Sequence, residues 1–173
     1  IRAAISNNLL NVLPCKLFGI GPMFRRERPQ KGRYRQFNQI NFENFGTTNP
    51  FSDIELILIA YKLLKSLLPN TKVDLYINSL GDRSSLKKYK KILSDFFEQN
   101  KGKLSYENRS KIQNNPLRIL DSKVEEDKKL INKAPLMIEF LTKETLSHYE
   151  FIKKSLNELE INFFEDNSLV RGL

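Results

Sequence analysis

The sequence predicts an α+β fold in which a mixed sheet is interrupted by a mainly helical segment. Two strand-like runs, 15–24 and 37–43, flank a polar loop and form a long-looped hairpin. Strand-like patterns return at 72–79 and 161–170. Between these two, residues 83–160 are rich in lysine and have apolar residues at helical spacing. A sheet with a helical insertion follows from this order.

The first half of the chain supplies the hairpin and two helices. Residues 1–13 have helical spacing, and Pro14 ends the run. The stretch "CKLFGIGPMF" is typical of a strand, with its glycines and proline marking an edge or a bend. Ser52 and Asp53 can cap a helix predicted over 53–68.

The second strand of the hairpin alternates with a period of two. This alternation places four side chains on one face, Phe37, Gln39, Asn41 and Glu43, and four on the other, Asn38, Ile40, Phe42 and Asn44. One face therefore carries an aromatic ring together with polar groups.

Composition indicates a globular chain with an anionic partner. The 173 residues are 40% hydrophobic and 28% charged, with a formal net charge of +9. The single cysteine, Cys15, and single histidine, His148, support neither a disulfide framework nor a metal site, and a reducing intracellular compartment is expected. The most apolar segment, "IELILIAYKLLKSLL", contains two lysines and is too short to span a bilayer, so no membrane partner is expected.

The stretch "FRRERPQKGRYRQFNQINFENFG", residues 24–46, is the strongest candidate for a site. It holds six basic side chains: Arg25, Arg26, Arg28, Lys31, Arg33 and Arg35. Two interpretations follow from the residues alone. One is a solvated basic loop on a half-exposed sheet. The other is a site for two neighbouring ligands, in which arginines bind the phosphates of a nucleotide, Phe37 stacks on its base, and Gln39 and Glu43 contact the second ligand.

Four stretches favour the second interpretation. "GPMFRRERPQKGRYRQFNQINFENFG" resembles the second signature motif of the class II aminoacyl-tRNA synthetases, in the form found in histidyl-tRNA synthetases. "INSLGD" (77–82), "NNPLRILDSK" (114–123) and "LVRGL" (169–173) resemble further parts of that family in the same order. The resemblance spans almost the whole chain.

The resemblance implies a fold and a division of the chain. The fold would be part of the class II synthetase antiparallel sheet flanked by helices, with an inserted mainly helical domain. Residues 1–82 would be a partial catalytic core, 83–160 the helical insertion, and 161–173 the return to the core. The chain would then be an internal fragment of a catalytic domain, and we expect it to be inactive alone.

The resemblance also implies residue roles. Arg25 and Arg171 would bind the α-phosphate of ATP and the histidine carboxylate, and act in catalysis. The remaining ATP contacts would be Glu27 to the adenine amino group, Arg33 to the terminal phosphates and Phe37 stacked on the base. The remaining histidine contacts would be Gln39 and Glu43. No protein side chain is assigned to a metal.

Candidates for tRNA contact are weaker. Gln30 and Arg35 would meet the acceptor end, and four lysines of the insertion would meet phosphates: Lys87, Lys88, Lys90 and Lys91. A solvated helix face explains the four lysines equally well.

The activity implied for the full-length protein is histidine–tRNA ligation with L-histidine, ATP with Mg²⁺, and histidine tRNA, by a cytoplasmic homodimer. Two alternatives stay open at this point. A synthetase-like regulatory paralogue would sense histidine without catalysis, and would be expected to lose the ATP-binding arginines. A plain RNA-binding module would depend on charge alone and would give Gln39 and Glu43 no role.

Overall fold

The computed structural model describes residues 1–170, which divide into two compact units, 1–60 and the part of the chain from Tyr61 onward. The helix α2 (Pro50–Leu67) begins in the first unit and ends in the second. Within 1–170, every helix is too short or too polar to cross a lipid bilayer.

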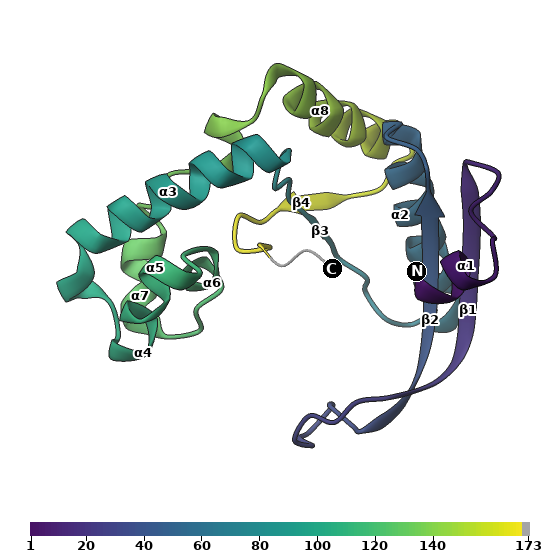
Figure 1. The fold of residues 1–173 in the computed structure, drawn as a ribbon, viewed down its shortest axis with the longest axis horizontal. Helices are drawn as coiled ribbons and strands as arrows, with labels where there is room; N and C mark the ends of the chain where they lie inside the picture. Colours follow the sequence, from purple (N-terminus) through teal and green to yellow (C-terminus); the bar gives the residue numbers. More distant parts are fainter. Residues whose placement is uncertain (171–173) are drawn as a thin grey trace. The chain divides into compact units, whose positions relative to one another are not determined.

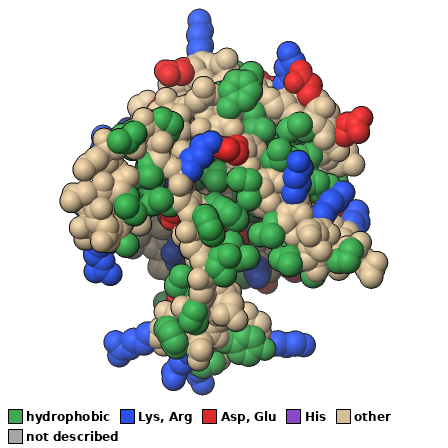
Figure 2. All heavy atoms as spheres, turned by 90° about the vertical axis from the view of Figure 1, so that its right-hand side faces the viewer, with side chains coloured by type: hydrophobic (Ala, Val, Ile, Leu, Met, Phe, Trp, Pro, Cys, Tyr) green, Lys and Arg blue, Asp and Glu red, His purple; other side chains and the backbone are tan. Residues whose placement is uncertain are grey.

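The first unit is built on an antiparallel hairpin. Strand β1 (Cys15–Phe24) pairs with β2 (Gln36–Phe45) along its whole length, from Cys15 opposite Phe45 to Phe24 opposite Gln36. A long loop, residues 25–35, joins the strands at one end (Figure 1). Lys and Arg side chains surround the tip of this loop at the bottom of Figure 2. The predicted long-looped hairpin is therefore present.

The register gives the hairpin two different faces, because directly opposite residues of an antiparallel pair point to the same side. We call one the open face, formed by Leu17, Gly19, Gly21, Met23, Phe37, Gln39, Asn41 and Glu43. The other face is more apolar, and three of its β1 side chains are strongly exposed: Phe18 (73%), Ile20 (69%) and Phe24 (73%). Hydrophobic side chains are visible above the loop in Figure 2.

The helices of the first unit differ from their predicted bounds. Helix α1 (Arg2–Ser6) is shorter than the predicted 1–13, because Asn8 adopts a left-handed conformation (φ 55°) that ends the helix. Helix α2 starts at Pro50, ahead of the predicted residue 53. The side-chain oxygen of Asn49 accepts a hydrogen bond from the Phe51 backbone N–H (3.0 Å), and a proline suits a first helical position.

The second unit is mainly helical. Its longest helix, α3 (Arg83–Gln99), buries Ser85, Tyr89, Leu93 and Phe97 at a spacing of four residues. Short elements follow: η1 (Lys101–Lys103), α4 (Tyr106–Arg109), α5 (Lys111–Asn114), α6 (Leu117–Leu120), α7 (Glu125–Ile131) and η2 (Met137–Phe140). Figure 1 shows the short helices gathered beside α3.

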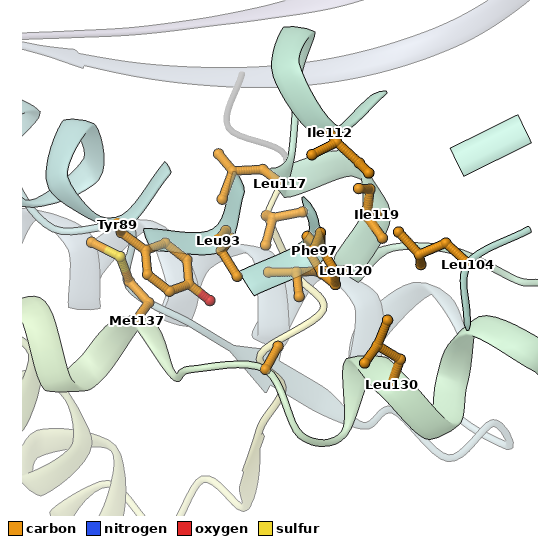
Figure 3. Packing of buried hydrophobic residues seen from close by; sticks show 12 residues of the cluster. Tyr89, Leu93, Phe97, Leu104, Ile112, Leu117, Ile119, Leu120, Leu130 and Met137 are labelled. Atoms are coloured by element: carbon orange, nitrogen blue, oxygen red, sulfur yellow. The ribbon is translucent and has the colours of Figure 1, made fainter. Parts of the chain in front are cut away.

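One hydrophobic core joins these helices. Leu93, Phe97, Ile112 and Ile119 have no exposed surface, and they meet among further leucines in Figure 3. The Tyr89 hydroxyl lies at the edge of the core and donates a hydrogen bond to the Pro135 carbonyl (2.8 Å). Burial, assisted by the negative charge of Glu139, raises the pKa of Tyr89 to about 12.

A short parallel sheet completes the second unit. Strand β3 (Leu75–Ile77) pairs with β4 (Phe163–Glu165), and helix α8 (Lys143–Glu158) precedes β4. Parallel strands require a crossover connection, and the whole helical segment lies within this one. The Tyr149 hydroxyl of α8 donates to a Glu165 carboxylate oxygen of β4 (3.1 Å).

Both strands of this sheet are shorter than the runs 72–79 and 161–170 predicted. After β4 the chain turns, because the Asp166 carboxylate accepts a hydrogen bond from the Ser168 backbone N–H (2.8 Å). The predicted division into 1–82, 83–160 and 161–173 stays a prediction.

Candidate functional site

The first candidate site lies where the hairpin strands meet the basic loop. The strand ladder continues for one step past β1, since the Arg25 N–H donates to the Arg35 carbonyl (2.8 Å). The loop closes again at its tip, where Gln30 and Arg33 exchange two backbone hydrogen bonds around Gly32, which has φ +76°. Backbone hydrogen bonds therefore fix the loop at two places, at its base and at its tip.

Arg25 is anchored against the open face. Its Nε donates to the Tyr34 carbonyl (2.7 Å), and its guanidinium carbon lies 4.1 Å from the centre of the Phe37 ring. Within residues 1–170, Nε is the only guanidinium nitrogen of Arg25 in a hydrogen bond, so both Nη groups can meet a phosphate or carboxylate. The structure therefore places two predicted site residues, Arg25 and Phe37, in direct contact.

Glu27 and Arg33 form an ion pair across the loop. Both side chains are about half exposed (55% and 46%), so the attraction is screened by water and contributes little to stability. The resemblance gave these residues to opposite ends of ATP. In the structure they bind one another, and a ligand that uses both must separate them.

The open face brings together the predicted ligand residues of β2. Phe37, Gln39 and Glu43 follow one another along one side of the strand, at spacings of about 6.6 Å and 13 Å from pleat geometry. Opposite them, β1 supplies Gly21 beside Gln39 and Gly19 beside Asn41. A Cβ atom on Gly21 would have nothing within 4 Å. Gln39 therefore stands beside uncovered backbone at Gly21, whereas Glu43 stands opposite the Leu17 side chain.

The two glycines are a part of the site that the sequence prediction missed. The sequence predicts an edge or a bend at these positions, and β1, whose single neighbour in the described sheet is β2, continues through both glycines as an edge strand. The available signal was their spacing, because glycines two residues apart in a strand leave the same face without side chains.

The candidate tRNA residues lie in two places. Gln30 and Arg35 are exposed on the basic loop of the first unit. In the second unit, the four lysines occupy the exposed side of α3, away from the buried row of that helix: Lys87, Lys88, Lys90 and Lys91. Lys88 Nζ lies 5.9 Å from the centre of the Phe140 ring. Arg171 lies outside the described residues.

The loop adjoins the open face in the first unit, where Arg25 contacts Phe37. Arginine forks at its loop end match phosphate oxygens, and the Phe37 ring can stack on a base. Gln39 offers an amide, and Glu43 offers a carboxylate that accepts hydrogen bonds from an ammonium or imidazole N–H. The arrangement suits a nucleotide next to a small ligand that carries hydrogen-bond donors.

The fold and this surface define a class of protein. Residues 1–149 match the family model described as the tRNA synthetase class II core domain (G, H, P, S and T). The chain belongs to this family of class II synthetase core domains.

Individual relatives within this family are histidine–tRNA ligases. The chain is 48% identical over 161 residues to a histidine–tRNA ligase of Wolbachia sp. subsp. Brugia malayi, covering 93% of this chain and 39% of that protein. It is 40% identical over 176 residues to the histidine–tRNA ligase of Ligilactobacillus salivarius, covering 100% of this chain and 41% of that protein.

A solved structure agrees with the sequence relatives. The apo histidyl-tRNA synthetase of S. aureus superposes with a TM-score of 0.72 at 33% identity, covering 99% of this chain and 40% of that one. The α+β class II fold predicted from the sequence is confirmed. The chain spans about two fifths of the length of these relatives.

Proposed function

We propose that the full-length protein containing this chain is a histidine–tRNA ligase. It activates L-histidine with ATP to histidyl-adenylate and pyrophosphate, then transfers histidine to the 3′-terminal ribose of its tRNA. The observation that carries the proposal is the continuity of the arginine-bearing loop with the open face, on which Gln39 stands opposite the bare backbone of Gly21 and Glu43 stands opposite Leu17. The names of the relatives support the choice of amino acid.

In the proposed reaction, a histidine carboxylate oxygen attacks the α-phosphorus of ATP. The new bond is a mixed anhydride, and the bond to the bridging oxygen breaks in line, so that the electron pair leaves with pyrophosphate. The carboxylate is already ionised and needs no general base. The protein must align the two substrates and neutralise charge on the α-phosphate.

The side chains divide this work by position. Arg25, with both Nη groups available, stabilises the charge that develops on the α-phosphate and holds the attacking carboxylate. ATP enters as its Mg²⁺ complex. Arg33 binds the terminal phosphates and Glu27 the adenine amino group once their ion pair opens. Phe37 stacks on the adenine, and its ring also contacts the Arg25 guanidinium.

The remaining assignments extend this proposal. Gln39 and Glu43 bind histidine, Arg171 supports the α-phosphate from the other side, and Gln30 and Arg35 meet the acceptor end of the tRNA. The full-length enzyme acts in the cytoplasm as a homodimer.

The test is histidine-dependent exchange between ATP and labelled pyrophosphate, measured on the full-length protein. We expect Arg25→Ala to lower kcat/KM by about 10²- to 10³-fold, the usual cost of removing one donor to developing charge. Arg26→Ala is the matched control, because the neighbouring side chain alternates to the opposite side of the strand end, and it should leave exchange unchanged.

Three results would contradict the proposal. Exchange that depends on another amino acid would replace histidine as the substrate. If calorimetry shows that histidine binds and that ATP does not bind, the sensing paralogue is favoured. Binding of neither ligand, with salt-dependent RNA affinity, would favour an RNA-binding module.

A further inference from the structure

Asn78 directly follows strand β3 and joins two segments that lie 91 residues apart in the chain. Its side-chain Nδ2 donates a hydrogen bond to the carbonyl of Leu169 (3.2 Å). Its Oδ1 accepts a hydrogen bond from the backbone N–H of Ser79 (2.9 Å). The two contacts fix the orientation of the amide, because the nitrogen faces an acceptor and the oxygen faces a donor. The proposed function gives this side chain no role.

The segment that Asn78 holds is the turn after β4, drawn in yellow beyond that strand in Figure 1. The turn closes on itself, since the Leu169 N–H donates to the Asp166 carbonyl (3.1 Å). A backbone hydrogen bond attaches its start to β3, from the Asp166 N–H to the Ile77 carbonyl (3.0 Å). The hydrogen bond from Asn78 to Leu169 attaches its end. The turn is therefore held at both of its ends by neighbouring residues of one loop.

The surroundings of the turn make the hydrogen bond from Asn78 important for its path. Val170, which is 7% exposed, packs into the hydrophobic core of the second unit. The turn also borders a cavity of about 360 Å³, which is lined by Asn167 and Ser168 of the turn and by Pro135 of the helical segment. A backbone segment that borders a cavity has few contacts on that side, so the contacts on its other sides determine where it lies.

The turn leads directly to Arg171 in the sequence. The proposed function, on which this inference rests, assigns Arg171 to the α-phosphate of ATP. A side chain that stabilises developing charge acts best when it is held in place before the reaction. Misplacement of a reacting group by about 1 Å can cost about 10²-fold in rate. The backbone just ahead of Arg171 therefore has to be fixed, and Leu169 is the residue of that backbone that Asn78 binds.

We propose that Asn78 is a positioning residue for the activation of histidine: its side-chain NH₂ fixes the Leu169 carbonyl, and thereby the point from which Arg171 extends. Asn78 acts through the backbone and contacts neither substrate. Because charge on the α-phosphate grows as the new bond forms, loss of the positioning contact weakens the interaction with the transition state more than the binding of the substrates. The effect therefore falls on kcat.

The experiment measures kcat, KM for histidine and KM for ATP by pyrophosphate exchange with the full-length protein. Asn78→Ala lowers kcat by about 10- to 10²-fold and leaves both KM values within about threefold. Asn78→Asp keeps an acceptor for the Ser79 N–H but sets a carboxylate oxygen against the Leu169 carbonyl, so it lowers kcat at least as much. Asn157→Ala, which changes an exposed asparagine of α8, is the matched control and leaves all three constants unchanged.

A double-mutant cycle tests whether Asn78 acts through Arg171. Arg171→Ala alone lowers kcat by about 10²- to 10³-fold, the usual cost of removing one donor to developing charge. In that background Asn78→Ala lowers kcat by about twofold at most, because the side chain that it positions is gone. A residue that only stabilises the fold would lower kcat by the same factor in both backgrounds. Thermal unfolding of each variant shows whether it is folded, and Asn78→Asp carries the test if Asn78→Ala does not fold.

The outcomes separate this inference from the function on which it rests. A wild-type protein without histidine-dependent exchange overturns the proposed function. Full kcat in Arg171→Ala overturns the assignment of Arg171 to the α-phosphate, and with it the role of Asn78. In an active wild type whose exchange depends on Arg171, normal kcat in Asn78→Asp overturns the role of Asn78 alone. Independent losses in the double-mutant cycle, or a change in KM without a change in kcat, also overturn that role.

Discussion

At the scale of single residues, Asp127 is the most deeply buried charged group among residues 1–170. Its side chain has no exposed surface. It accepts hydrogen bonds from the Ser105 backbone N–H (2.7 Å), the Ser105 hydroxyl (2.8 Å), the Asn108 amide and the Ser122 hydroxyl (3.0 Å). One carboxylate thus joins α7 to α4 and to the segment before α7.

These hydrogen bonds make the stability of the second unit depend on pH. Burial acts to raise the pKa of Asp127 and is the largest single effect, but the hydrogen bonds together lower it below its ordinary value of 3.8. A lowered pKa in the folded state means that the stabilisation is present above pH 3.8. It is lost as the pH falls below that value through the folded pKa.

We therefore expect Asp127→Asn to destabilise the second unit by about 2 kcal/mol or more at pH 7, because an amide cannot accept all of these donors. Urea unfolding at pH 7 and at acidic pH measures the effect, and the difference between variant and wild type should shrink as Asp127 is protonated. Asp95→Asn, an exposed carboxylate of α3, is the control. A difference that is independent of pH would contradict this role of Asp127.

Alternation alone predicts which residues of β2 share the open face, since a period of two places Phe37, Gln39 and Glu43 on the same side of the strand. The contacts between Arg25 and Phe37 and between Glu27 and Arg33 could not. They depend on how the loop closes at Gln30, and sequence spacing carries no information about that closure.

At the scale of elements, the junction between β3 and α3 shows why the motif "INSLGD" has its sequence. Asp82 caps α3 by accepting from the N–H groups of Ser84 and Ser85 (both 2.8 Å), and also accepts from the hydroxyl of Thr142, the cap of α8 (3.0 Å). Hydrogen bonds from Ser84, Ser85 and Thr142 lower the pKa of Asp82. One carboxylate thus orients the starts of two helices.

Gly81 sets the turn that delivers Asp82. Its φ is +63°, and a Cβ atom there would be 2.6 Å from Leu141 Cδ2 and 3.1 Å from both Met137 Cε and Ser85 Cβ. We expect Gly81→Ala to lower the free energy of unfolding by about 2 kcal/mol or more, from left-handed strain of about 1–2 kcal/mol plus the steric overlap. Chemical denaturation measures it.

Gly102→Ala is the matched control for that change. Gly102 lies in η1, and a Cβ atom there would have nothing within 4 Å. The control should lose little or no stability. Equal losses in the two variants would contradict the role of the geometry at Gly81, because the effect of Gly→Ala on the entropy of the unfolded chain is by itself stabilising.

Hydrophobic periodicity predicted whether a segment forms a helix or a strand, but it did not predict the residues at which the helix or strand ends. The long helices α3 and α8 lie where amphipathic spacing predicted them. The ends of α1, α2 and β4 depend on Asn8, Asn49 and Asp166, residues whose local hydrogen bonds or backbone angles compete with regular structure. Such competition is decided by tertiary packing, which a single sequence does not display.

At the scale of the whole molecule, the net charge of +9 is unevenly distributed. The loop of the hairpin concentrates six basic side chains around one glutamate, and the proposed function assigns part of them to ATP. The exposed side of α3 carries a second group of positive charge, the four lysines at 87, 88, 90 and 91. For this second group, phosphate contact and simple solvation predict different behaviour in salt.

If the α3 lysines bind tRNA phosphates, neutralising them should weaken tRNA binding and reduce its salt dependence. We expect the variant with all four lysines changed to Gln to raise KM for tRNA in aminoacylation. The slope of log K against log salt should fall by about 0.7–0.9 for each phosphate that a lysine no longer neutralises. Pyrophosphate exchange without tRNA should be unaffected, because lysines that bind phosphates in this way position the tRNA and leave activation of histidine alone.

A control with the same change in net charge separates location from total charge. Four other exposed lysines of the second unit serve this purpose: Lys128, Lys129, Lys133 and Lys143. Equal effects of the two sets would mean that the overall field attracts tRNA and that α3 has no special role. Unchanged KM and unchanged slope in the α3 variant would mean that its lysines are solvated. An effect confined to the α3 set would place the tRNA backbone along this helix.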